Sequence, residues 1–147
     1  MYRKLVLLLL IFMSQNALSE ETVNSNNDPR TLVTMPDQAR NLMRQDMLNN
    51  LSALNQIIAF LADNKFDEAA ELSETILGRS AMGKYRGTGM GPGRFMTPEM
   101  RNIGWNMHEA ASEFSIIAKQ GDLKSAYSAL PKITSTCVAC HAKFRTR

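Results

Sequence analysis

The chain has only two cysteines, Cys137 and Cys140, so no framework of disulfides is available to support the fold. Its only histidines are His108 and His141, so a zinc site would have to combine both of them with the two cysteines. Adjacent Cys140 and His141 rarely bind one ion together, which argues against zinc. Strand-like alternation of apolar and polar residues is also missing. These absences leave helices packed by their apolar faces as the expected architecture.

Long apolar runs are missing too, since the longest, Leu5 to Met13, has nine residues and is too short to span a bilayer. Arg3 and Lys4 precede this run and Ala17-Leu18-Ser19 follows it, as in a secretory signal peptide. We therefore expect residues 1–19 to be a signal peptide that is removed after Ser19. The mature protein is then periplasmic, and no permanent membrane anchor is expected.

The chain has little excess charge of either sign. Without Arg3 and Lys4 the mature chain has fifteen basic residues against fourteen acidic ones, a formal net charge of +1. This balance does not indicate the basic face that nucleic-acid binding requires. We therefore expect no nucleic-acid partner.

Apolar residues recur at helical spacing through most of the remaining chain. Polar residues 20–33 show no period and are expected to form a flexible tail. The domain 34–147 is expected to hold four helices that begin near Thr34, Phe66, Thr97 and Asp122, with Thr34, Thr97 and Asp122 as N-caps. The expected inward face of the first helix consists of Met43, Met47, Leu51, Leu54, Ile58 and Leu61. The prediction is an all-α domain, an antiparallel four-helix bundle, with a long Gly- and Met-rich loop at residues 79–96.

The last predicted helix carries Cys137-Val138-Ala139-Cys140-His141. A C-x-x-C-H run is the attachment pattern of a c-type haem, in which both thiols bond the haem and the imidazole becomes an axial iron ligand. Positions i, i+3 and i+4 share one face of a helix, so all three side chains reach the same porphyrin. A thioredoxin-like redox pair would need a preceding strand, which the helical flanks do not provide. We therefore predict one covalently attached haem c.

The chain resembles the class II c-type cytochromes, meaning cytochrome c prime and its low-spin, methionine-ligated relatives. The resemblance rests on a C-terminal haem motif on the last of four helices, the opening Gly121-Asp122-Leu123 of that helix, and Phe144-Arg145 after the motif. It implies that Cys137 and Cys140 hold the haem and that His141 is the proximal ligand. It also implies that Arg145 lies near the haem.

The resemblance further implies that the second axial position is supplied by the first helix. Met47 is the expected ligand; Met43, His108 or no ligand at all are the alternatives. Thioether ligation raises the potential and suits an electron carrier. Arg40 shares the face of Met47 and is expected to pair with a haem propionate.

The function expected from these residues is that of a one-electron carrier between redox partner proteins, not an enzyme. The main alternative is a five-coordinate cytochrome that binds NO or CO. A peroxidase would need an acid–base group above the iron, and Asp46 and Arg44 do not provide an obvious one. Trp105 is expected to point away from the core, where it would serve a homodimer contact or a docking surface.

Overall fold

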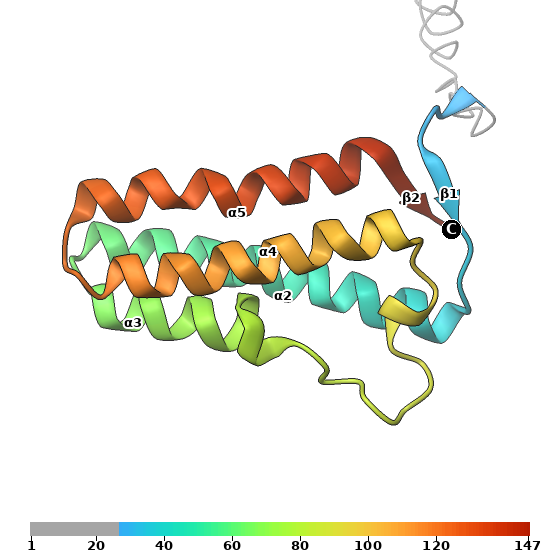
Figure 1. Cartoon of the computed structure of the whole chain (residues 1–147), viewed down its shortest axis with the longest axis horizontal. Coiled ribbons are helices and arrows are strands. Elements are labelled where there is room, and N and C mark those ends of the chain that lie inside the picture. The colour runs from blue at the N-terminus through green and yellow to red at the C-terminus, as the bar shows by residue number, and fades with distance from the viewer. Residues whose placement is uncertain (1–26) are drawn as a thin grey trace, which may run out of the picture.

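The computed structural model describes residues 27–147, so the predicted signal peptide and residues 20–26 of the predicted tail lie outside the described residues. The helices are α2 (Asp37–Ala62), α3 (Phe66–Leu72), α4 (Pro98–Ala118) and α5 (Leu123–Lys143), as Figure 1 shows. The all-α prediction is confirmed. None of these helices has both the length and the apolarity needed to cross a bilayer.

Two helix starts follow the predicted capping chemistry and one does not. The Thr97 side chain accepts a hydrogen bond from the backbone N–H of Met100 at 3.1 Å, and Asp122 accepts one from Ser125 at 2.8 Å. The prediction that Thr34 caps the first helix is wrong, because α2 begins at Asp37 and no side chain caps it. The fixed backbone angle of Pro36 prepares this start instead.

The connection between α3 and α4 is irregular, as predicted. α3 continues directly into the π-helical segment η2 (Ser73–Leu77), and single 3₁₀ turns follow at η3 (Arg79–Ala81) and η4 (Pro92–Arg94). Asp46 of α2 accepts a hydrogen bond from the Tyr85 hydroxyl at 2.8 Å and forms an ion pair with Lys84. These contacts fasten the loop to one flank of α2.

The helices do not pack equally against one another. α5 lies along α4, and two ion pairs, Lys132 with Glu113 and Lys143 with Glu99, join their edges. α3 and η2 pack against both α2 and α4, whereas α5 makes few contacts with α2. We call this boundary, at which the two backbones come close at few points, the α2–α5 seam.

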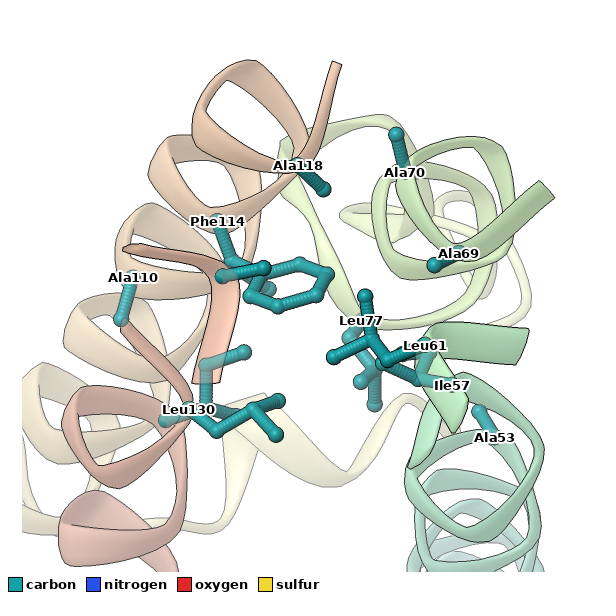
Figure 2. Close-up of a cluster of buried hydrophobic side chains, with 13 residues drawn as sticks. Ala53, Ile57, Leu61, Ala69, Ala70, Leu77, Ala110, Phe114, Ala118 and Leu130 are labelled. Atoms are coloured by element: carbon teal, nitrogen blue, oxygen red, sulfur yellow. The ribbon is translucent and has the colours of Figure 1, made fainter. Parts of the chain in front are cut away.

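The apolar core is divided into two clusters. The first contains Phe114 of α4, which Figure 2 shows pointing toward Leu61 and Ile57 of α2, and it includes residues from all four helices. The second lies at the opposite end of the helices, where α2 begins and α5 ends. It contains Val33, Met35, Ala39, Met43, Met100 and Phe144. Cys140 is partly buried against this second cluster.

The inward face of α2 differs from the predicted one. Met47, Leu51 and Ile58 are 40%, 66% and 48% exposed, so their assignment to the core is wrong. The buried residues of α2 are Ala39, Met43, Ala53, Ile57 and Leu61. The helix is turned toward Asp46 because this carboxylate is held by Tyr85 and Lys84 of the loop. The apolar arc of α2 is wide, and only one edge of it is covered.

The end of the predicted flexible tail is part of the fold. β1 (Thr31–Val33) pairs in parallel with β2 (Phe144–Thr146), in the register Thr31 to Phe144. Val33 is buried in the second cluster. The folded region therefore begins before residue 34, and the start and end of the described chain lie side by side (Figure 1).

Replacing Phe114 with alanine should lower the free energy of unfolding by about 3–5 kcal/mol, because its fully buried ring fills the centre of the first cluster. Urea denaturation followed by circular dichroism measures the change. Ile116→Ala is the matched control, since Ile116 is exposed on the same helix and should cost less than about 0.5 kcal/mol. Equal losses in both variants would contradict the assigned core.

Candidate haem-binding site

The C-x-x-C-H motif occupies the last turns of α5. Cys137 and Cys140 are free thiols and half-buried, whereas His141 is exposed. The Cys137 thiol lies 3.7 Å from the carbonyl oxygen of Ile133, its partner one turn earlier in the helix. Both sulfurs are therefore held on a regular helical turn and are not joined in a disulfide.

Two side chains of the motif, those of Cys137 and His141, face away from α4. Lys132 and Lys143 mark the flank of α5 that touches α4, through their ion pairs with Glu113 and Glu99. At about 100° per residue, Cys137 and His141 lie roughly 120–180° around the helix from both lysines. The two side chains therefore lie on the flank of α5 that borders the α2–α5 seam.

The facing flank of α2 is apolar and uncovered. Asp46 marks the flank that the loop covers. At about 100° per residue, Met47, Leu51 and Ile58 lie roughly 100–140° around from Asp46, on the other side of the helix. Their exposure thus belongs to the border of the seam. A row of large apolar side chains left open beside a reactive motif is typical of a ligand site.

The two core clusters fix which parts of α2 and α5 lie level with one another. Leu61 and Ile57 share the first cluster with Ala126 and Leu130, and Met43 shares the second with Phe144. The start of α2 and the end of α5 lie at the same end of the molecule (Figure 1). The turn of α2 that contains Met47 therefore lies level with the motif.

The two methionine candidates differ in their surroundings. Met43 is only 7% exposed and is already packed in the second cluster, beside Cys140. Met47 lies one turn further along α2, on the flank that borders the seam. Met47 can therefore turn toward a group in the seam without leaving a hole in the core, whereas Met43 cannot.

Arg40 lies on the same flank of α2 as Met47, by the same count of about 100° per residue. It forms an ion pair with Asp37, but its Nε atom is buried and has no hydrogen-bond partner. A buried donor without an acceptor is costly. This arrangement suits an anionic group arriving in the seam, as the expected propionate would.

Arg145 has other partners. Its Nε donates a hydrogen bond to the carbonyl oxygen of Arg30 at 3.2 Å and lies 3.6 Å from the Asp28 carboxylate. Arg30 in turn donates to the carbonyl oxygen of His141 at 3.4 Å, one of the last carbonyls of α5. Hydrogen bonds from Arg30 hold the pKa of Asp28 well below its usual range. Arg145 thus fastens the N-terminal segment over the end of α5.

Asp28 and Arg30 are residues that sequence reasoning missed. They lie in a polar segment without periodicity, and their partners Arg145 and His141 are more than a hundred residues away. Only the adjacent Asp28-Pro29-Arg30 sequence, with its opposite charges, hinted at a local turn. They matter to the site because they hold the backbone of the helix end that carries the motif.

His108 and Trp105 lie elsewhere. The Nδ1 of His108 donates hydrogen bonds to the carbonyl oxygens of Leu77 (2.7 Å) and Gly78 (3.1 Å), so it is engaged beside η2 and not at the motif. Trp105 is 50% exposed, which confirms the expectation that it points outward. Within residues 27–147, no group of three or more His, Cys, Asp or Glu side chains is arranged to hold a metal ion.

A cavity of about 550 Å³ lies on the loop side of α2. Its lining mixes polar residues such as Asn49, Gln56 and Thr75 with apolar ones such as Leu72 and Ile76, and it includes none of the motif. The cavity and the motif are therefore separate features of the structure. Comparison of the chain with protein-family models, with curated proteins and with solved structures finds no match in any of the three.

In the haem-free protein, burial and the neighbouring Cys137 thiolate both raise the pKa of the Cys140 thiol. A raised pKa lowers the thiolate fraction at neutral pH, so Cys140 should react slowly with iodoacetamide. The rate of alkylation against pH, measured in a Cys137→Ser variant, should have its midpoint above that of an unfolded thiol. The same variant in guanidinium chloride is the control, and equal midpoints in the two conditions would contradict the burial of Cys140.

Proposed function

We propose that this chain is an exported monohaem c-type cytochrome, similar to class II cytochromes, that carries single electrons between periplasmic redox proteins. Its helices would form an antiparallel four-helix bundle, with one haem c attached through Cys137 and Cys140. One observation carries the proposal: the C-x-x-C-H motif and an exposed apolar flank of α2 both border the α2–α5 seam. The proposal includes no catalytic role.

The borders of the seam suit a porphyrin, which is flat and largely apolar. Met47, Leu51 and Ile58 together leave much apolar surface in water. Burying a side chain of this size stabilises by about 1.5–3 kcal/mol. A haem between α2 and α5 would cover this surface and fill the space between these two helices.

Each residue of the site then has a stated role. The thiols of Cys137 and Cys140 anchor the group, His141 supplies one axial imidazole, and Met47 supplies the thioether on the other side. Arg40 offers its partnerless Nε to a propionate. When bound, the haem iron accepts and returns one electron, and the axial ligands set its potential.

The surroundings of Asp46 support a carrier over an enzyme. Its carboxylate is taken up by the hydroxyl of Tyr85 and the ammonium of Lys84. Burial and the Asp46 carboxylate raise the pKa of Tyr85, so the phenol stays protonated and keeps donating. A carboxylate held in this way on the loop flank is not placed to move protons in the seam.

Replacing both Cys137 and Cys140 with alanine should abolish covalent haem, since both thioether bonds are lost. The measurement is haem staining on a denaturing gel, after expression with a c-type haem-attachment system. Val138→Ala is the matched control within the motif, because Val138 is exposed and should leave haem attachment unchanged. Covalent haem in the double cysteine variant would disprove the proposal.

Met47→Ala should remove the thioether ligand. The wild-type protein should show a low-spin spectrum with the thioether–iron charge-transfer band in the oxidised form and no reaction with CO when reduced. Met47→Ala should lose the band and bind CO, whereas Met43→Ala should keep both properties and lose about 2–5 kcal/mol of stability. A high-spin wild type that binds CO at once would favour the five-coordinate gas-binding alternative.

A further inference from the structure

The charges of the chain are segregated, although its net charge is small. We define the motif end as residues 27–49, 84–101 and 136–147, which include the start of α2, the loop, the start of α4 and the end of α5 (Figure 1). The side chains of this end comprise ten Lys or Arg and four Asp or Glu. The other described residues comprise five basic and eight acidic ones. The molecule is therefore positive where the motif lies and negative at the opposite end.

The acidic residues of the motif end are all neutralised locally. Each of the four is in an ion pair with a lysine or arginine of the same end: Asp28 with Arg30, Asp37 with Arg40, Asp46 with Lys84, and Glu99 with Lys143. Among the described residues, Arg44, Arg86 and Arg94 are exposed and have no such partner. The positive field of this end therefore reaches the solvent.

The opposite end shows the reverse pattern. Asp67, Glu68 and Glu71 of α3 are exposed and, among the described residues, no ion pair includes them. The segregation thus extends along the length of the helices. Such an arrangement orients a molecule in the field of a charged partner before contact is made.

Two of the free arginines are carried on a firmly held loop. Pro92 is buried, and Phe95 and Met96 pack against the second cluster, where Cys140 also lies. At its other end the loop is fastened to Asp46 through Tyr85 and Lys84. Arg86 and Arg94 therefore project from anchored backbone at the motif end, so little ordering is needed when they bind.

We propose that the motif end is the docking surface for a redox protein with a carboxylate-rich face, and that Arg86 and Arg94 are its main electrostatic contacts. The inference rests on the proposed function for its purpose, because docking here brings a partner to the end of the molecule that carries the motif. Complementary charge increases the rate of encounter and selects the productive orientation. A partner that met the acidic end instead would be held far from the motif.

The test uses an acidic plant-type [2Fe–2S] ferredoxin as the probe partner. Stopped-flow measurement gives the second-order rate at which reduced ferredoxin reduces the haem-loaded protein, over a range of salt concentrations. Arg86→Glu with Arg94→Glu should lower the rate at low salt by about tenfold or more. The matched control, Lys119→Glu with Lys124→Glu, makes the same charge change at the opposite end and should stay within about twofold of wild type.

Equal rate losses in the two double variants, or a wild-type rate that does not fall with salt, would overturn the proposal. A second pair of results would also overturn it. In these, the wild type co-sediments with phosphatidylglycerol vesicles and only the arginine variant does not, while the ferredoxin rate is the same in both double variants and the wild type. The surface would then bind a membrane. Binding of oxidised ferredoxin to the immobilised protein needs no haem. If the chain carried no haem, the proposed function would be disproved. Comparing ferredoxin binding between the two double variants would still show whether the motif end is the docking surface.

Discussion

The division of the apolar core into two clusters is the constraint on which the rest of the structure depends. The first cluster takes residues from all four helices, whereas the second joins Met43 near the start of α2 to Phe144 at the end of α5. Between them α2 turns polar Asp46 toward the loop and leaves Met47 and Leu51 open. Direct packing of α2 on α5 is therefore incomplete at the level of the C-x-x-C-H motif. Apolar surface left open beside a reactive motif is a common place for a ligand or a partner to bind.

The motif does not rely on the seam for its position. α5 is held along its length by α4, and its last turn is held by Arg30 and Arg145 from the two ends of the described chain. The exposed ion pairs between α4 and α5 contribute little energy, so the apolar contacts between these helices carry the stability. The cysteines and His141 thus sit on a fixed scaffold, while the facing flank of α2 keeps large apolar side chains exposed. Reactive groups held by rigid elements are positioned more precisely than groups on loops.

Helix positions could be predicted from the sequence because local signals determine them. Thr97, Asp122 and the periodic apolar residues mark their helices without reference to the rest of the chain. The rotation of α2 could not be predicted, because its apolar residues cover a wide arc and the contact that selects one edge, Tyr85 with Asp46, comes from a distant loop. β1 was missed because three residues carry no period. The net charge likewise concealed the segregation of Arg44, Arg86 and Arg94 from the acidic residues of α3. At the site, the C-x-x-C-H motif could be identified from the sequence. The roles of Asp28, Arg30 and Arg145 in holding the end of α5 could not, because they depend on contacts between distant residues that no local pattern encodes.

The parallel pairing of β1 with β2 also sets the order in which the chain can complete itself. The hydrogen bond from Arg30 to His141 joins residues 111 positions apart, and the strand pair around it is just as nonlocal. During synthesis from the N-terminus, β1 cannot pair until the residues of β2 have been made. Closing so long a loop is then expected to be a late step of folding. The last turn of α5 therefore depends for its order on residues from both ends of the described chain. The backbone that carries the two cysteines is complete only when these distant segments have met.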